Sequence, residues 1–437
     1  MYQNLRTNLP KEVMMFPDFP FPEEGPSFIH HTEVLKYLHQ YADYFQLYKY
    51  IKFNTEVCKV TPKENIWTVH LKENDANNVE KRNFDFIIVC NGHYSIPHWP
   101  MIPGLSEFPG QKLHSHDYRN NSHFEGQEVV VVGAGPSGID IAIEIAQVAK
   151  KLVEVYGEKC MDIKNVRKWC REFNEGRINV HDEQRSGRPS LPESTVARID
   201  EMVRANRRIT LEEIEDGLNE DCSHFSVHKI ESETLGYRKV ILSHNKVLSS
   251  PFPSNLYLES ELDCIKDNVV YFKNGNSHYA DSILVCTGYQ YDFPFLDPSC
   301  RIKIRDTNIV WPLYKHIINV FHPTMAFIGI PSQIPPFPFF YQQIKFFLSA
   351  IEEKMILPQE SEMLQDIDDN INYLLNSGLP EHHAHKMPSP ILWEYDDDIS
   401  KMASIKPISQ KVRELYEITS ALRKKYLLSY KDHNFNE

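Results

Sequence analysis

The sequence has few glycines, few cysteines and no long apolar run. Its 437 residues include 17 glycines and 8 cysteines. The cysteines are scattered, with neither metal-ligand spacing nor the density of a disulfide framework, so we expect reduced thiols and a cytoplasmic location. No stretch approaches the roughly 18 apolar residues of a spanning helix, and no secretory signal follows Met1. We therefore expect this protein to be neither exported nor membrane-spanning.

Positive charge is also in short supply. Lysine and arginine number 47 against 60 acidic residues, a net charge of −13, which makes nucleic acid an unlikely partner for the whole chain. The 41% hydrophobic and 24% charged fractions are typical of globular proteins and exclude extended disorder. The length predicts two or three domains.

The strongest local signal is a glycine motif. Four valines, 129–132, run into Gly133-Ala134-Gly135-Pro136-Ser137-Gly138, and apolar residues then recur at helical spacing. This pattern predicts strand, tight turn and helix. Gly133 would permit the turn, Gly135 would leave space for a pyrophosphate, and Gly138 would let the helix pack closely on the strand. Amides at the helix N-terminus would bind the phosphates, so the motif predicts dinucleotide binding.

The second strand of this unit comes late in the sequence. It should end about 20 residues past the last glycine, but the next β-like run is Val240-Ile241-Leu242-Ser243, about 100 residues past it. Treating residues 152–239 as an insertion restores the spacing. We therefore expect the helix that ends near Lys151 to be followed, in the fold, by the strand at Val240.

Residues 152–239 have a character of their own. Amphipathic helical patterns on either side of a basic linker, Arg185–Ser190, are typical of paired helix-turn-helix units. The segment resembles the DNA-binding region of mariner-type transposases in phrases such as Asp182-Glu-Gln-Arg-Ser-Gly-Arg-Pro189 and Leu235-Gly-Tyr-Arg-Lys239. Its acidic residues outnumber its basic ones, so weak phosphate binding is expected. We favour a captured fragment without a specific role over a DNA-contacting module.

Strand patterns fill much of the remaining chain. Alternating apolar residues within 47–53, 55–60, 67–71 and 84–90 predict a β-meander that returns to a central sheet. Two strands close on glycine, one in Cys90-Asn91-Gly92 and the other in Cys286-Thr287-Gly288. Because one closure lies on each side of the glycine motif, the sequence predicts two nested dinucleotide-binding domains.

A family resemblance becomes specific just before the glycine motif. Phe108, Gly110, His114 and Tyr118 fit the F-x-G-x-x-x-H-x-x-x-Y pattern, and the chain resembles flavin-containing monooxygenases along essentially its whole length outside 152–239. Further matching phrases are Thr7-Asn8-Leu9-Pro10, Asn91-Gly92-His93-Tyr94, Ser243-His244, Cys286-Thr287-Gly288-Tyr289 and Phe293-Pro294-Phe295-Leu296.

The resemblance implies an α/β fold of two nested Rossmann-like domains with β-meanders, plus the all-α insert. The first part of the FAD-binding domain would be residues 1–124, and 125–151 with 240–290 would form the NADPH-binding domain. The insert would be 152–239, and 291–437 would complete the FAD domain and add a helical region. We expect His114 and Tyr118 to have structural roles, and residues 382–386, which contain three histidines, to form a solvated loop without a metal.

The implied activity is oxygenation of soft nitrogen or sulfur atoms in small nucleophilic substrates, using O₂, FAD and NADPH. Gly133 to Gly138 would hold the NADPH pyrophosphate. Ser243, His244 and Lys246 would meet the 2′-phosphate, because no carboxylate stands at the position that NAD-specific proteins use. Asn8 matches the asparagine that the family places beside the flavin and is the candidate catalytic residue, with turn initiation as the alternative.

One departure from the family is expected to matter. The family begins with a further GxGxxG for FAD, and the sequence contains no second such motif. We therefore expect a FAD domain that is truncated at its N-terminus and holds FAD weakly or not at all. The alternatives are an inactive nucleotide-binding remnant and a DNA-interacting protein acting through 152–239. Peripheral attachment to the endoplasmic reticulum is the alternative to a purely cytoplasmic location.

Overall fold

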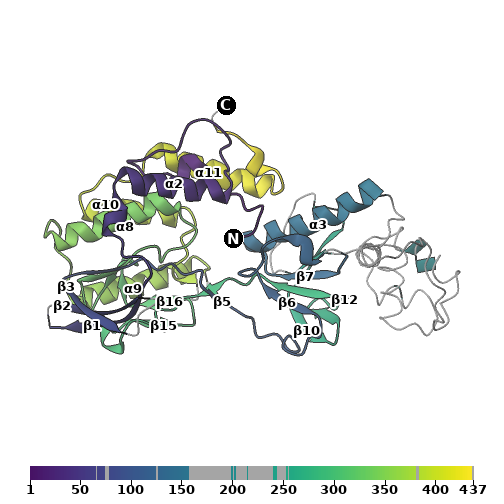
Figure 1. Cartoon of the computed structure of the whole chain (residues 1–437), viewed down its shortest axis with the longest axis horizontal. Helices are drawn as coiled ribbons and strands as arrows, with labels where there is room; N and C mark the ends of the chain where they lie inside the picture. The colour runs from purple at the N-terminus through teal and green to yellow at the C-terminus, as the bar shows by residue number, and fades with distance from the viewer. Residues whose placement is uncertain are drawn as a thin grey trace. The chain divides into compact units, whose positions relative to one another are not determined.

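The structure is a computed structural model. It describes residues 1–64, 66–73, 78–124, 126–156, 198–199, 201–202, 214, 240–243, 252–253, 255–379 and 383–435. The chain divides into two compact units (Figure 1), one formed by Met1–Asn4 with His98–Gly288 and the other by Leu5–Pro97 with Tyr289–Glu437. The helix-turn-helix prediction for 152–239 falls almost entirely outside the described residues, as do His244 and Lys246.

A five-stranded parallel sheet organises the first unit. Its order is β6-β13-β7-β8-β9, with bounds β6 (Gln111–His114), β13 (Ser282–Val285), β7 (Val129–Val132), β8 (Val240–Ser243) and β9 (Leu256–Glu259). Val129 pairs with Ser282 on one side and with Val240 on the other. All four residues of β7, β8 and β13 are buried, as in parallel strands covered on both faces. The strand predicted at Val240 is confirmed as the neighbour of β7.

The strand order reverses beside β7. From β7 the chain adds β8 and then β9 on one side of it. Later in the sequence it returns and adds β13 on the other side of β7. In open α/β sheets, ligands bind outside the carboxyl ends of the strands at such a reversal. Helix α3 (Pro136–Tyr156) leaves this edge and packs on the sheet, and an antiparallel meander, β10 (Leu262–Lys266), β11 (Val269–Phe272) and β12 (Ser277–Tyr279), follows β9.

The first unit begins earlier than the boundary at residue 125 that we drew from the sequence. Apart from Met1–Asn4, its segment begins at His98 and includes β6, which forms parallel hydrogen bonds with β13 at the edge of the sheet. Three residues of the F-x-G-x-x-x-H-x-x-x-Y pattern, Phe108, His114 and Tyr118, are buried here. The Nδ1 atom of His114 accepts a hydrogen bond from the backbone N–H of His116, and Tyr118 packs edge-on against Tyr2. These contacts agree with structural roles for both residues.

The second unit contains a meander and a small mixed sheet. The meander is antiparallel, with β1 (Thr55–Lys63), β2 (Ile66–Glu73) and β3 (Val79–Phe84). The four-stranded sheet has the order β17-β18-β19-β4, with β17 (Leu313–Tyr314), β18 (Ile318–Asn319), β19 (Met325–Phe327) and β4 (Ile87–Val89). Two strand pairs are separate: β5 (Ile96–Pro97) with β14 (Tyr289–Gln290), and β15 (Lys303–Arg305) with β16 (Ile309–Trp311).

The strand predicted within 47–53 is wrong. Residues Leu47–Tyr50 form a 3₁₀ helix, η1, which follows Gln46 in the left-handed conformation. A reversal of the backbone at that point prevents the extended conformation that a strand requires. The strands predicted within 55–60, 67–71 and 84–90 are present as β1, β2 and β4, and β3 was not predicted.

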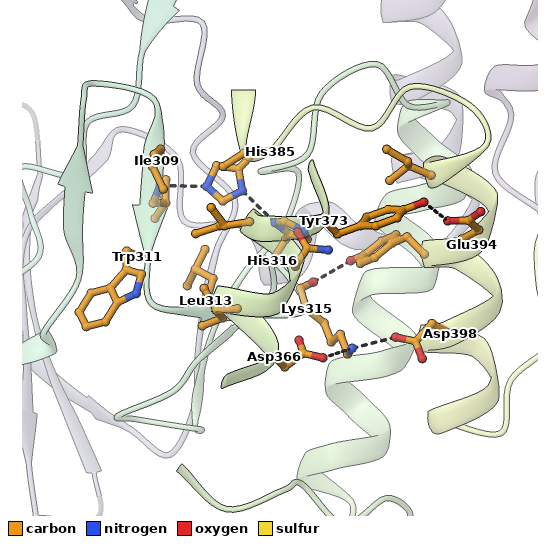
Figure 2. Close-up of a pocket in the computed structure, with 17 residues that line it drawn as sticks. Ile309, Trp311, Leu313, Lys315, His316, Asp366, Tyr373, His385, Glu394 and Asp398 are labelled. Carbon is orange, nitrogen blue, oxygen red and sulfur yellow. Dashed lines mark hydrogen bonds and ion pairs between the residues drawn. The ribbon is translucent and has the colours of Figure 1, made fainter. Parts of the chain in front are cut away.

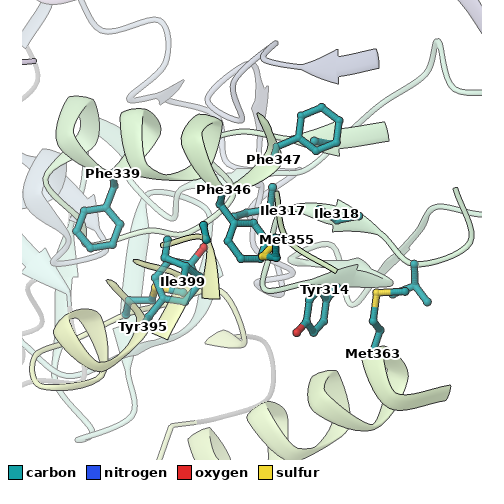
Figure 3. Packing of buried hydrophobic residues seen from close by; sticks show 14 of the residues in the cluster. Tyr314, Ile317, Ile318, Phe339, Phe346, Phe347, Met355, Met363, Tyr395 and Ile399 are labelled. Carbon is teal, nitrogen blue, oxygen red and sulfur yellow. The ribbon is translucent and has the colours of Figure 1, made fainter. Parts of the chain in front are cut away.

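Helices contribute part of the core of the second unit. They are α1 (Lys11–Met14), α2 (His31–Tyr44), α8 (Pro336–Ile351), α9 (Glu360–Asn376), α10 (Ile391–Met402) and α11 (Gln410–Lys425), with short 3₁₀ turns at Pro298–Cys300 and Tyr430–Asp432. Figure 3 shows aromatic side chains of α8, Phe339 and Phe346, packed with Ile317 of the sheet region and Ile399 of α10, all fully buried. No helix in the described part of the chain is long and apolar enough to cross a membrane.

Candidate dinucleotide site

Two glycines of the motif are required by the fold itself. Gly133 has φ +107°, a conformation that side chains rarely adopt, and a Cβ there would lie 2.7 Å from the Cys286 carbonyl oxygen. At Gly138 a Cβ would lie 1.8 Å from the Gly133 oxygen, so the first turn of α3 can approach the turn only without a side chain. The tight turn and the close helix–strand packing expected from the sequence are both present.

Gly135 differs from the other two. A Cβ at Gly135 would meet nothing within 4 Å, and its φ is not positive. Neither backbone strain nor packing in this chain therefore calls for glycine at that position. The open space lies at the start of α3, where Pro136 takes the first helical position and loses no hydrogen bond for its missing N–H. Because the fold itself does not require glycine here, the missing side chain is best explained by a ligand that comes close to the backbone. The N-terminal amides of α3 beside it are suited to bind a pyrophosphate.

The turn is tied to the end of the second strand. The backbone N–H of Gly133 donates to the Ser243 carbonyl oxygen at 3.0 Å. Ser243 is 3% exposed, and its hydroxyl donates to the Ser260 carbonyl oxygen at 2.8 Å. The structure therefore brings Ser243 to the same edge of the sheet as the glycine turn. Its hydroxyl proton, however, is donated to Ser260, and this hydrogen bond joins β8 to the segment after β9.

A buried carboxylate, Glu259, lies at the end of β9 and was not predicted from the sequence. Glu259 accepts hydrogen bonds from His278 Nε2 at 2.8 Å and from Asn274 at 2.9 Å. Burial works to raise the pKa of Glu259, but these hydrogen bonds outweigh it and the pKa lies below its usual range. The pair anchors the β11–β12 turn to the strand edge. No motif could have indicated it, because the two residues meet only when the meander folds back.

Asn8 belongs to the other unit. Its side-chain oxygen accepts a hydrogen bond from the Tyr430 hydroxyl at 3.2 Å, and the residue is half-buried. This contact holds the carboxamide in one orientation. Asn8 is therefore a positioned side chain in the second unit, whereas Gly133 to Gly138 and Ser243 gather in the first.

A flavin cradle is not formed by the described residues of the second unit. There, Gly92 follows β4 with φ +73°, as the predicted strand closure requires, but no helix follows it. Gly329, after β19, has φ +84°, and a Cβ there would lie 3.0 Å from the Phe340 ring. Among the residues described, no strand in this unit runs through a glycine-rich turn into a helix that would bind a second pyrophosphate. The residues present do not fit the FAD pyrophosphate.

The solvated loop predicted at 382–386 is wrong for His385, whereas His382 lies outside the described residues. His385 is 7% exposed, and its Nε2 atom accepts the backbone N–H of Val310 at 2.9 Å. Its Nδ1 atom lies 2.9 Å from Nδ1 of His316 (Figure 2). Packing against β16 removes this histidine from solvent. In the described ranges, no group of three histidine, cysteine or acidic residues could hold a metal ion.

Comparison with known proteins relates this geometry to a family. The family model for flavin-binding monooxygenase-like proteins matches residues 1–168 and 194–412. The unmatched stretch, 169–193, lies inside the segment 152–239, and the match includes the remainder of that segment.

Among curated relatives, the flavin-containing monooxygenase FMO GS-OX-like 2 of Arabidopsis thaliana is 32% identical over 432 residues, which are 95% of this chain and 74% of that protein. Flavin-containing monooxygenase FMO GS-OX1 of the same plant is 31% identical over 417 residues, covering 93% of this chain and 72% of that protein.

Solved structures agree with the family match. S-allyl-L-cysteine S-oxygenase from Allium sativum superposes with a TM-score of 0.74 at 26% identity, covering 99% of this chain and 81% of that one. Tmm from Pelagibacter sp. strain HTCC7211 has the same fold, with a TM-score of 0.70 at 20% identity, 99% coverage of this chain and 79% of that one. With the family model matched over most of its length and relatives above 30% identity, the chain belongs to the flavin-containing monooxygenase family.

Proposed function

We propose that this protein binds NADPH at the β7–α3 turn and serves a flavin-dependent oxygenation of soft nitrogen or sulfur atoms in small molecules. The observation that carries the proposal is the open space at Gly135, at the reversal of strand order in the parallel sheet. Family membership supports the flavin and nicotinamide cofactors. The fold shared with an S-oxygenase supports sulfur as one reacting atom.

The chain's own residues prepare the nucleotide site. The carbonyl oxygen of Ser243 holds the Gly133 amide, which keeps the turn against the strand edge. The amides at the start of α3 would bind the pyrophosphate, and the Glu259–His278 pair would keep the neighbouring turn in place. When bound, NADPH supplies a hydride.

Selectivity for NADPH over NADH is proposed from the end of β8. Ser243 stands there instead of a carboxylate, so nothing at that residue would repel a 2′-phosphate. His244 and Lys246, which follow in the sequence, are proposed as its polar and cationic partners. Asn8 is proposed, on the family resemblance, as the residue beside the flavin. The hydrogen bond from Tyr430 would hold its carboxamide there.

Substitution of Gly135 tests the proposal. Gly135→Val should leave the melting temperature nearly unchanged, because a Cβ there meets no atom within 4 Å. NADPH binding, measured by titration calorimetry, should be lost because the side chain fills the space of the pyrophosphate. Gln147→Val, at an exposed position of the same helix, is the matched control and should bind normally. Unchanged affinity in Gly135→Val would mean that the turn is not the site.

Gly138→Ala provides a contrast within the same turn. Its Cβ would lie 1.8 Å from the Gly133 oxygen, so the helix must shift away from the strand. We expect a loss of stability of about 2 kcal/mol, within the range of overpacked cores. Loss of binding in this variant should therefore accompany lower stability, whereas in Gly135→Val it should not.

A second candidate function is a dinucleotide-binding protein without oxygenation. It is favoured by one observation: the described residues of the second unit form no cradle for the FAD pyrophosphate. Flavin content distinguishes the two candidates.

A further inference from the structure

A cavity lies within the second unit, far along the sequence from the glycine motif. It has a volume of about 210 Å³ and opens between strands β16 and β17 on one side and helices α9 and α10 on the other (Figure 2). All of its lining residues fall between 309 and 398. An apolar cavity of about 150 Å³ can hold benzene, so this one has room for a molecule of about seven heavy atoms.

The buried residues of the lining, here called the floor, carry no charge. Ile309, Leu313 and Ile391 line it together with the two histidines. Because Nε2 of His385 accepts the Val310 N–H, the proton of His385 must be on Nδ1, which donates to Nδ1 of His316. Burial lowers the pKa of both imidazoles, that of His316 to about 4. Neither histidine therefore carries charge at neutral pH.

The more exposed residues of the lining, here called the mouth, are mainly acidic. Its one ammonium group, on Lys315, is held between carboxylates of Asp366 on α9 and Asp398 on α10, the latter at 2.9 Å. Glu394 is exposed and accepts a hydrogen bond from the Tyr373 hydroxyl at 3.1 Å. Three carboxylates and one ammonium leave two net negative charges. The ammonium of Lys315 is engaged by both aspartates, so an anion would meet only repulsion.

We propose that this cavity binds a small organic ammonium cation. Its apolar groups would lie on the isoleucine and leucine floor, and its charge would lie at the mouth beside Glu394 and Asp398. The ring of Tyr373, which lines the cavity, adds a surface that attracts cations. A neutral molecule of the same shape would gain the apolar contacts alone, and an anion would be excluded.

Choline and 3,3-dimethylbutan-1-ol test the charge requirement, because the two have the same shape and differ only in the cationic nitrogen. The nitrogen of choline is quaternary and has no lone pair to be oxygenated, so its binding is independent of the proposed oxygenation. By titration calorimetry on the full chain, we expect saturable choline binding and at least about tenfold weaker binding of the neutral alcohol. Equal binding of the two, or no saturation by choline, would overturn the proposal.

Two variants assign the binding to this cavity. Glu394→Gln keeps the acceptor for Tyr373 but removes one charge, and should weaken choline binding about fivefold. Asp368→Asn, at an exposed position of α9 outside the cavity lining, is the control and should bind normally. Ala384→Leu, at a 4% exposed position of the lining, should fill the cavity and abolish binding. Choline affinity unchanged in Glu394→Gln would refute the site even if Ala384→Leu failed to fold.

Discussion

The paired imidazoles of His316 and His385 show how burial sets the chemistry of single residues. Hydrogen bonds fix the tautomer of each ring, and the neighbouring charged group, Lys315, further lowers the pKa of His316. For His385, burial lowers the pKa most, followed by the imidazoles of His316 and His93. A proton added to Nε2 of His385 would face the Val310 N–H, and two donors would then point at each other. The pair is therefore stable only while both rings are neutral.

This pair predicts an acid-sensitive stability. In the unfolded chain each histidine takes up a proton as the pH falls below about 6.5, whereas the pKa of folded His316 is about 4. The unfolded state then binds more protons, so the free energy of unfolding should fall as the pH is lowered from 6.5 towards 4. Urea unfolding across this range provides the measurement.

The control for the pH prediction is His385→Gln. Its side-chain oxygen can still accept the Val310 N–H, but the side chain cannot be protonated. We expect this variant to lose less stability between neutral and acidic pH than the unmodified chain. Identical pH profiles for the two proteins would show that the pair does not govern acid sensitivity.

At the scale of elements, strand β8 and helix α3 are both held to the sheet by contacts outside the segment between them. Strands β7 and β8 pair residue for residue, from Val129 with Val240 to Val132 with Ser243. The side chain of Asn255, before β9, donates to the Ala146 carbonyl oxygen of α3 at 3.1 Å. The helix is thereby joined to the sheet by contacts that do not involve residues 157–239.

Deletion of residues 152–239 should preserve the nucleotide site. Helix α3 ends and β8 begins at the edge of the sheet opposite the carboxyl ends of the strands, so a chain rejoined there would leave the glycine turn unchanged. We expect a Lys151–Val240 fusion to bind NADPH within about twofold of the full chain and to melt no lower, since loop length has only a weak effect on stability. Calorimetry and thermal unfolding provide the measurements. An insoluble fusion beside a well-folded full chain would show that the segment is an integral part of the domain.

At the scale of the whole molecule, the described residues form a pyrophosphate-binding turn in one unit only. The first unit has a strand, glycine turn and helix for one pyrophosphate, and the described residues of the second unit have none for another. We expect purified chain 1–437 to contain no bound flavin and to bind added FAD only weakly, so that oxygenation would require FAD in excess, while NADPH binds normally. Visible absorption and fluorescence titration measure this. A yellow preparation with FAD near one equivalent would contradict it and favour oxygenation over the second candidate function.

Sequence patterns were sufficient where the determinants are local. The valines before Gly133 and the spacing of the three glycines predicted strand, turn and helix, because backbone strain and close packing at Gly133 and Gly138 arise within a few residues. The strand at Val240 could be predicted from its continuous apolar run, which parallel strands need when both faces are buried. The same reasoning failed within 47–53, where a left-handed residue turns the chain.

By itself, therefore, the sequence determined the glycine turn, the strand at Val240 that follows in the sheet and the family pattern around His114. Only the tertiary structure decided which distant residues meet. It brings β6 beside β13, buries Glu259 against His278, and places His385 under β16 rather than in solvent. The physical reason is that hydrogen bonds and desolvation depend on neighbours in space. Neighbours separated by tens of residues leave no periodic signal in the chain.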